Sequence, residues 1–202
     1  MEYKGGARKW LRTCAYVDPK SGVLTASGYR RNLWRTTRAH LEFSCHSRGV
    51  AHRDGDGWVE CTCGNRHWGL HGAAGLLLFR DGAVLLQHRA PWVHNGDTWG
   101  IPGGARDSHE SVTDAAIREA VEEIGMEPHL LHPLKTFEDN HGNWRYDTII
   151  ASADPNLVAH EQNDESQQVE WVHIDQVVEK NLHPSFANTW PKLLPILREL
   201  FV

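Results

Sequence analysis

The chain has 202 residues, of which 40% are hydrophobic, and a formal net charge of −5 at pH 7. This length accommodates one domain of ordinary size with a small appendage, and the apolar content is sufficient for a core. The acidic balance excludes a general basic surface for nucleic acid. No apolar run approaches the roughly eighteen residues of a membrane span, and no apolar signal core follows the N-terminus, so we expect a cytoplasmic protein without a membrane partner.

Composition divides the chain into three segments. Residues 1–44 are irregular and basic, since residues 1–40 carry nine Lys or Arg against two acidic side chains. Residues 45–71 form a small module rich in cysteine and histidine, which contains the turn-forming run Asp54-Gly-Asp-Gly57. Residues 72–202 have regular hydrophobic patterning, and we expect them to form the main domain.

Hydrophobic periodicity and turn residues predict the elements of this third segment. Leu76–Phe79, a turn at Arg80–Gly82 and Val84–Arg89 indicate a β-hairpin. Trp99–Gly104 indicates a short strand that leads into a glycine loop, and a helix follows. The later elements are predicted strands at Leu130–Glu138, Arg145–Ser152 and Val169–Ile174, and predicted helices at Asp175–Lys180 and Phe186–Leu200, the last shortened or kinked by Pro191 and Pro195.

The predicted helix after the glycine loop places three carboxylates on one face. Glu119, Glu122 and Glu123 stand at positions i, i+3 and i+4 and can converge on one point. Two carboxylates about 4 Å apart near a protein surface repel by roughly 4 kcal/mol, and a divalent cation removes that cost. Oxygen ligands favour Mg²⁺ or Mn²⁺. A solvated acidic helix face is the alternative.

The residues around this helix favour a docked helix with an exposed acidic edge. Asp107 is predicted as its N-cap, with Glu110 completing a capping box, and Gly125 can end it in the left-handed conformation. Apolar residues give the helix a side to bury: Val112, Ala116, Ile117, Ala120, Val121 and Ile124.

The stretch from Gly104 to Met126 resembles the Nudix box, G-x5-E-x7-R-E-U-x-E-E-x-G-U, in which U is apolar, and every specified position is filled. The resemblance implies an α/β fold, the Nudix α/β/α sandwich with a mixed sheet, preceded here by a small loop-rich N-terminal segment. It also implies that Glu119, Glu122, Glu123 and the Gly104 carbonyl bind Mg²⁺ or Mn²⁺. In the same pattern Arg118 orients a carboxylate through charge-assisted hydrogen bonds, and Glu110 caps the helix.

The box does not decide which carboxylate takes the proton from water. Glu119 and a carboxylate on the downstream chain are the rival general bases. Glu170 resembles the position from which some Nudix members supply an extra metal ligand, and we include it among the catalytic candidates. An exposed strand carboxylate is the alternative for Glu170, and Glu165 in the preceding loop is a weaker rival.

Substrate contacts are assigned to Trp99, Gly103, Gly104 and Arg89. The glycines let the backbone approach a ligand, and Trp99 can stack on a nucleobase, although packing is the commoner role of such a ring. The Trp99-x-x-Pro-Gly-Gly lead-in resembles MutT-type nucleoside triphosphate pyrophosphohydrolases. The proline and the tyrosine that mark ADP-ribose and dinucleoside polyphosphate hydrolases are not found at their expected places after the box.

The cysteines predict a second metal site. Without a secretory signal they are better interpreted as reduced thiols than as a disulfide framework. Cys45, Cys61, Cys63 and His67 form a Cys₃His set suited to structural Zn²⁺. Ordinary buried thiols in a hairpin are the alternative, because Cys-x-Cys is less diagnostic than Cys-x2-Cys. Three further histidines compete for the fourth place: His46, His52 and His71.

Together these features predict a Mg²⁺-dependent hydrolase of nucleoside diphosphate-linked substrates, with a nucleoside triphosphate pyrophosphohydrolase as the leading hypothesis. The alternatives are an ADP-ribose, NADH or dinucleoside polyphosphate pyrophosphatase, a non-catalytic ligand sensor, and a protein that processes RNA 5′ ends. We expect a small nucleotide as the partner and neither nucleic acid nor membrane. The oligomeric state stays open, and a homodimer is compatible with the sequence.

Overall fold

The computed structural model describes residues 53–200 and, before them, the backbone of two short antiparallel strands, β1 (Tyr16–Val17) and β2 (Leu24–Thr25). The chain separates into two compact units, residues 1–47 and residues 48–202. The rest of the predicted irregular segment, and Cys45, lie outside the described residues. The second unit carries the fold and the candidate site.

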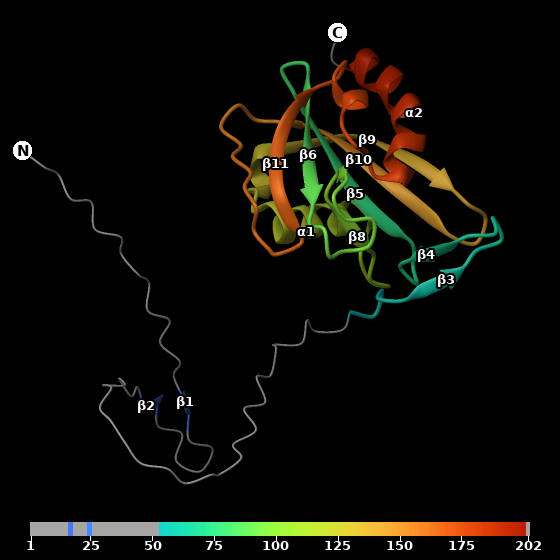
Figure 1. The fold of residues 1–202 in the computed structure, drawn as a ribbon, viewed down its shortest axis with the longest axis vertical. Helices are drawn as coiled ribbons and strands as arrows, with labels where there is room; N and C mark the ends of the chain where they lie inside the picture. The colour runs from blue at the N-terminus through green and yellow to red at the C-terminus, as the bar shows by residue number, and fades with distance from the viewer. Residues whose placement is uncertain (1–15, 18–23, 26–52, 201–202) are drawn as a thin grey trace, which may run out of the picture. The chain divides into compact units, whose positions relative to one another are not determined.

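A seven-stranded mixed sheet forms the centre of the second unit (Figure 1). Five strands follow the order β11-β6-β5-β10-β9, and the short strands β7 and β8 pair with β6 and β5. β10 runs parallel to β5, whereas the other neighbours are antiparallel, which makes the sheet mixed as predicted. The strands are β5 (Ala73–Arg80), β6 (Ala83–Arg89), β7 (Trp99–Gly100), β8 (Gly103–Ala105), β9 (Leu131–Asn140), β10 (Arg145–Ala153) and β11 (Ser166–His173).

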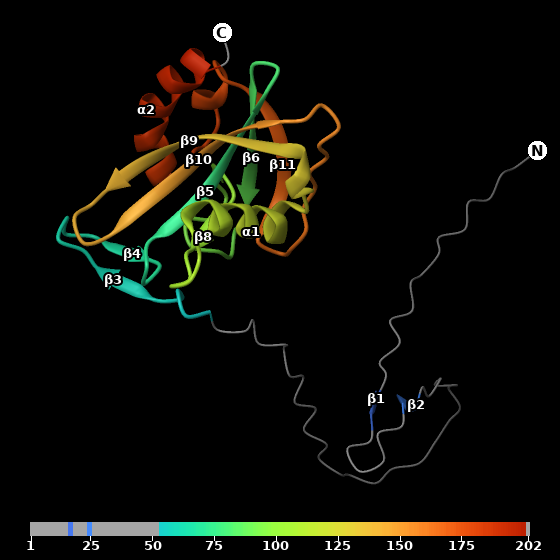
Figure 2. The ribbon, with the colours of Figure 1, turned by 180° about the vertical axis from the view of Figure 1, so that it is seen from behind.

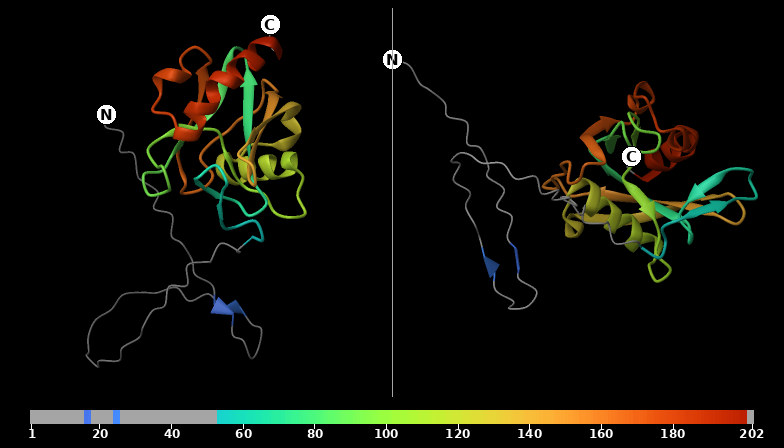
Figure 3. Two further views of the ribbon diagram at one scale, coloured as in Figure 1. Left: turned by 90° about the vertical axis from the view of Figure 1, so that its right-hand side faces the viewer. Right: turned by 60° about the horizontal axis from the view of Figure 1, so that its bottom comes forward.

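Two helices cover opposite faces of this sheet (Figures 2 and 3). Leu76 and Leu78 on β5 pack against α1 (Val112–Ile124), and Leu77 and Phe79 pack against α2 (Pro184–Leu200). Side chains alternate between the two faces of a strand, and β5 is buried on both faces, so its sequence is a continuous apolar run. The predicted α/β/α sandwich is confirmed.

The tight turn between β5 and β6 explains the predicted hairpin. Asp81 and Gly82 both have positive φ angles, 51° and 75°, as the two-residue turn that matches the twist of paired strands requires. Phe79 pairs with Val84 and Arg80 with Ala83, so the register follows directly from the Asp-Gly turn.

The predicted C-terminal helix is present, and its two prolines do not divide it into shorter pieces. α2 is continuous and contains Pro191 and Pro195, which were expected to shorten or kink it. Each interior proline costs about 3 kcal/mol. The opposite side of α2 buries four large apolar side chains, each worth about 1.5–3 kcal/mol, so packing outweighs the two prolines. These side chains are Phe186, Trp190, Leu193 and Leu197.

The predicted helix at Asp175–Lys180 is reduced to a single 3₁₀ turn, η2 (Val177–Glu179). A segment of six residues holds too few backbone hydrogen bonds to stabilise an α-helix. A second such turn, η1 (Pro128–Leu130), leads from α1 into β9. None of the helices in the described part of the chain is both long and apolar enough to cross a membrane.

A small hairpin, β3 (Trp58–Glu60) and β4 (Arg66–Trp68), lies beside the turn between β9 and β10 (Figure 3). The backbone N–H of Thr62 donates to Oδ1 of Asn143 at 2.8 Å, and the indole N–H of Trp144 donates to the carbonyl of Gly69 at 2.9 Å. Residues 53–71 therefore pack with the main sheet in one compact unit.

Candidate active site

The helix that carries the three carboxylates begins later than predicted. Ser111, and not Asp107, is the N-cap of α1, because its side chain accepts a hydrogen bond from the backbone N–H of Asp114 at 3.1 Å. Asp107 is used elsewhere: its carboxylate accepts from the backbone N–H of Gly55 at 2.9 Å. The segment before β3 is thereby attached to the loop that precedes α1.

The C-terminal end of α1 is fixed by a left-handed glycine and by a loop. Gly125 has φ 59° and closes the helix through its N–H to the carbonyl of Val121, as predicted. The carbonyl of Glu123 accepts from the backbone N–H of Gln162 at 3.0 Å and from the hydroxyl of Ser166 at 3.3 Å. The last turn of α1 is therefore held in place from the loop between β10 and β11.

Arg118 links two carboxylates of the predicted site. Its guanidinium forms a two-point pair with Glu110 at 2.6 and 2.8 Å and donates to Glu119 at 2.6 Å. The hydrogen bonds from Arg118 are the main reason why the pKa of Glu110 is lowered. Glu110 also accepts from the backbone N–H of Asp107 at 3.1 Å, so it does cap a local N–H, but its stronger interaction is with Arg118.

Glu123 is the most constrained of the three helix carboxylates. It is 5% exposed and accepts a hydrogen bond from the backbone N–H of Gly103 at 3.0 Å. The pKa of Glu123 is raised to about 8, chiefly by burial and next by the charge of Glu119, while the Gly103 N–H and the charge of Arg89 oppose the rise. Without a cation, this carboxyl group holds its proton at neutral pH.

Glu119 lies against the glycine strand. Burial is also the main cause that raises the pKa of Glu119, and the hydrogen bonds from Arg118 oppose it. A Cβ atom added at Gly104 would stand 2.6 Å from the carboxyl carbon of Glu119, a distance that real Cβ atoms essentially never show. The glycine at position 104 is therefore required for this carboxylate to lie where it does.

Glu122 is the most open of the three, with 44% of its side chain exposed. Arg53, which lies upstream of β3, forms an ion pair with Glu122 and a longer contact of 3.5 Å with Asp107. Sequence reasoning missed Arg53, because no local pattern connects residues 69 positions apart. The residues before β3 thus reach the acidic edge of α1.

Glu170 is not brought together with the helix carboxylates. Its neighbours Val169 and Trp171 pack on the α1 side of the sheet, so strand alternation directs Glu170 to the α2 side. There it forms an ion pair with Lys180 at 2.8 Å. The charge of Glu165, by contrast, contributes to the raised pKa of Glu123. Of these two strand and loop carboxylates, Glu165 is therefore the one whose charge acts on a helix carboxyl group.

The predicted substrate residues have different surroundings. Trp99 is 8% exposed, stacks on His88 with ring centroids 4.7 Å apart, and lies beneath the Lys180 ammonium at 4.3 Å, which is a packing role. Arg89 lies close enough to Glu123 for its charge to lower the pKa of that carboxyl group. Its buried Nε–H has no hydrogen-bond acceptor within residues 53–200. This Nε–H is an unpaired buried donor beside the helix carboxylates.

Comparison with known proteins decides the family. The model of the NUDIX domain matches residues 69–193, more than half of the chain. The chain belongs to the Nudix family. A crystal structure of the Nudix hydrolase RenU from M. smegmatis is 45% identical, covers 73% of this chain and 98% of the solved one, and has a TM-score of 0.67. The predicted Nudix fold is confirmed.

Two curated relatives are similar to this Nudix chain. A Mycobacterium tuberculosis protein named "Putative 8-oxo-dGTP diphosphatase 3" is 46% identical over 153 residues, which are 69% of each chain. A Bifidobacterium longum protein named "Nucleoside triphosphate pyrophosphatase/Nudix hydrolase fusion protein" is 36% identical over 84% of this chain, which spans only 39% of that relative. The prediction of a pyrophosphohydrolase is confirmed for the Nudix domain.

The donor set of the Nudix helix fits a hard divalent cation. Its side-chain groups are carboxylate oxygens, which Mg²⁺ and Mn²⁺ prefer. The charge of Glu122 raises the pKa of Glu119, and the charge of Glu119 raises that of Glu123, after burial in each case. The ionised forms of Glu119 and Glu123 are thus disfavoured, and a bound cation would reverse that effect.

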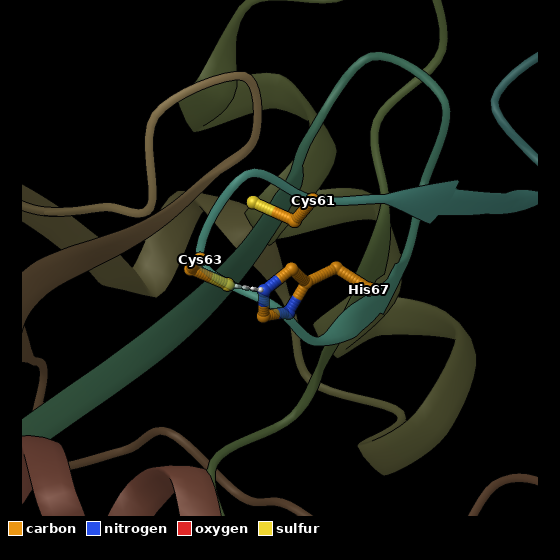
Figure 4. A group of neighbouring side chains, drawn as sticks. All are labelled: Cys61, Cys63 and His67. Carbon is orange, nitrogen blue, oxygen red and sulfur yellow. Dashed lines mark hydrogen bonds between the residues drawn. The ribbon is translucent and has the colours of Figure 1, made fainter.

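The second predicted metal site is brought together in part (Figure 4). Cys61, Cys63 and His67 direct their ligand atoms toward one another, all within 4.8 Å, on the β3–β4 hairpin. The fourth predicted ligand, Cys45, lies outside the described residues.

Proposed function

We propose that this Nudix protein is a divalent-cation-dependent nucleoside triphosphate pyrophosphohydrolase that converts its substrate to the nucleoside monophosphate and pyrophosphate. The observation that carries the proposal is the placement of two carboxyl groups, the buried Glu123 and the partly buried Glu119, against the Gly103–Gly104 strand. Both have raised pKa values, which is the condition expected of groups that release protons to a metal.

In this proposal Glu119, Glu122 and Glu123 hold Mg²⁺ or Mn²⁺, with the Gly104 carbonyl as a further candidate ligand. The cation supplies neutralising charge at the phosphates and acidifies water. Arg118 keeps Glu119 in position, and Glu110 in turn fixes Arg118 through the two-point pair. The guanidinium charge of Arg89, which acts on Glu123, makes this residue a candidate contact for a phosphate group.

The reaction requires a water molecule to lose a proton while its oxygen attacks phosphorus and the bridging P–O bond breaks. Glu119 and Glu165 are the two candidate general bases. Arg118 holds the carboxylate of Glu119 in a fixed position on the Nudix helix. The charge of Glu165, on the downstream loop, acts on Glu123. We favour Glu165, since a carboxylate committed to Arg118 and a cation is a weak proton acceptor. We do not assign this role to Glu170, because its carboxylate pairs with Lys180 on the α2 side of the sheet.

The proposed substrate class is a purine nucleoside triphosphate, including its oxidised form. The name of the M. tuberculosis relative supports this class, and that relative is 46% identical over 69% of this chain. The name of the B. longum relative also contains a nucleoside triphosphate pyrophosphatase. ADP-ribose, NADH and dinucleoside polyphosphates are the competing substrates, and RNA 5′ ends are a further one.

The test is a substrate panel with product identification. The full chain is incubated with Mg²⁺ and, separately, dGTP, 8-oxo-dGTP, ADP-ribose, NADH and a dinucleoside polyphosphate, and products are separated by anion exchange. We expect monophosphate and pyrophosphate from the triphosphates, with the highest kcat/KM for one of them. Preferred hydrolysis of ADP-ribose or NADH would overturn the substrate class, and no turnover with either Mg²⁺ or Mn²⁺ would leave a ligand sensor as the better account.

Glu123→Gln supplies the matched test of the site, with Glu127→Gln as control. Both changes remove one carboxylate without a change of volume, but Glu127 lies beyond the end of α1 with 69% of its side chain exposed. We expect Glu123→Gln to reduce kcat by at least about 100-fold and Glu127→Gln to leave it unchanged. Equal activity of both variants would contradict the assignment of Glu123.

A further inference from the structure

The geometry points to a Zn²⁺ site on the β3–β4 hairpin, with Cys61, Cys63 and His67 as ligands. Their sulfur and nitrogen atoms lie within 4.8 Å of one another, and Sγ of Cys63 is 3.1 Å from Nε2 of His67 (Figure 4). Ligand atoms around tetrahedral Zn²⁺ stand about 3.5–3.8 Å apart, given bonds of about 2.3 Å to sulfur and 2.0 Å to nitrogen. Small side-chain rotations bring the three atoms to these separations.

The hairpin turn preorganises the two sulfur ligands. The backbone N–H of Cys61 donates to the carbonyl of Asn65 at 2.9 Å, and the N–H of Gly64 donates to the carbonyl of Cys61 at 3.0 Å. Gly64 has φ +87°, a conformation that favours glycine, and it lets the chain reverse directly after Cys63. His67 follows on β4, where it pairs with Val59, and its ring lies beside the two cysteines of the turn.

Groups around the cluster orient its ligands. The ring of Trp144 stacks on the His67 imidazole with centroids 4.2 Å apart and planes 9° apart. The side-chain amide of Asn65 donates to Sγ of Cys63 at 3.7 Å, an interaction that a thiolate strengthens. Such outer contacts are typical of metal ligands, whose orientation they fix.

Apolar packing does not account for the exposed thiol of Cys63, and the Cys61 thiol donates to the carbonyl of His141 at 3.1 Å. Cysteines that serve as small apolar residues are usually buried, whereas Cys63 is exposed and Cys61 is only partly buried. Two soft ligands and an imidazole on a short exposed hairpin match the preference of Zn²⁺. A tetrahedral ion takes one further ligand besides the three that the hairpin supplies.

The ion would stabilise the hairpin together with its attachment to the main sheet. The tip residue Thr62 donates through its backbone N–H to Asn143, and the Asn143 amide donates to the carbonyl of Glu60 at 3.1 Å. Metal that binds the folded chain in preference to the unfolded chain raises the midpoint of thermal unfolding. The role is structural, because the three ligands are distinct from the carboxylates of the Nudix helix.

The test is metal content of the full chain, prepared without chelators and supplied with Zn²⁺ during expression. We expect about one equivalent of zinc in the wild type and in two controls, Cys14→Ser and His129→Asn. We expect less than about a tenth of an equivalent in Cys61→Ser and Cys63→Ser. Less than a tenth in the wild type, or a full equivalent in both cysteine variants, would overturn the site.

Cobalt substitution tests the ligands without any variant, in case the variants fail to fold. Bound Co²⁺ should give sulfur-to-metal charge-transfer absorption in the near ultraviolet, and Zn²⁺ should displace it. Absence of this absorption would overturn the thiolate ligands, as would a peptide carrying a Cys61–Cys63 disulfide in a digest of the unreduced protein. Glu123→Gln should retain the zinc, so this test and the hydrolase test fail separately.

Discussion

Gly104 leaves no room for a side chain beside Glu119. A Cβ atom at position 104 would stand 2.6 Å from the carboxyl carbon and 2.7 Å from both carboxylate oxygens of Glu119. Gly104 lies on β8 opposite Ala74 of β5, so the backbone is held by the sheet and the carboxylate has to move. The glycine of the Nudix box thus sets the position of a candidate metal ligand.

We therefore predict that Gly104→Ala reduces kcat/KM by about 100-fold or more, since a displacement of about 1 Å at a reacting centre has costs of that size. The fold should persist, because the atoms in conflict belong to a side chain. Gly100→Ala is the matched control on β7, where a new Cβ would meet only the Cβ of His183 at an ordinary 3.6 Å. Comparable activity of the two variants would show that Glu119 adapts freely.

The raised pKa of Glu123 predicts pH-dependent metal binding. Burial raises this pKa to about 8, so below that pH a cation has to displace a proton. Apparent Mg²⁺ affinity should therefore rise by about tenfold per pH unit between pH 6 and 8. Calorimetric titrations in buffers of different ionisation enthalpy measure both the affinity and the proton released. A flat affinity profile without proton release would contradict this account.

The same group predicts how metal removal changes stability. The folded pKa of Glu123 is raised above that of an unfolded glutamate, so the folded state binds more protons between about pH 4.5 and 8. With EDTA present, the free energy of unfolding should fall as pH rises through this window. Urea titrations at pH 5, 6.5 and 8 measure it, and Glu123→Gln should reduce the slope. An equal slope in both proteins would assign the effect to other groups.

The pair between Glu110 and Arg118 predicts an indirect effect on catalysis. Glu110→Gln keeps the volume but weakens the two-point pair, so Arg118 holds Glu119 less firmly. We expect kcat to fall by about 10- to 100-fold, with a smaller change in KM. Asp114→Asn is the control, because Asp114 interacts with Ser111 on the same helix and not with Arg118. An unchanged kcat for Glu110→Gln would leave Glu110 with a capping role alone.

The sequence predicted the helix carboxylates well because the relevant spacing is local. Residues at i, i+3 and i+4 share a helix face whatever the surroundings, and Gly125 ended the helix as expected. The residue at which α1 begins was less well determined by the sequence. Asp107-x-x-Glu110 and Ser111-x-x-Asp114 are equally good capping patterns, and the hydrogen bond from the distant Gly55 N–H to Asp107 selects the second.

Long-range contacts account for what the sequence did not predict. Arg53 meets Glu122 across 69 positions, and nothing in the residues around either one indicates this contact. The continuous α2 through Pro191 and Pro195 depends on burial against the sheet, which overrides the local preference of proline. Glu170 likewise lies on the α2 side of the sheet because its strand neighbours, Val169 and Trp171, pack on the α1 side.

Substitutions at Glu165 and Glu170 test which of the two carboxylates takes part in catalysis. We propose Glu165 as the general base, whereas Glu170 is expected to form only an ion pair. The charge of Glu165 acts on Glu123, whereas Glu170 pairs with Lys180 on the α2 side of the sheet. If Glu165 is the general base, Glu165→Gln should lower kcat by about 10²- to 10⁴-fold. Glu170→Gln should keep kcat within about threefold, since a partly exposed ion pair contributes about 1 kcal/mol or less to stability. The reverse ranking of the two variants would return Glu170 to the site, and normal activity in both would leave Glu119 as the base.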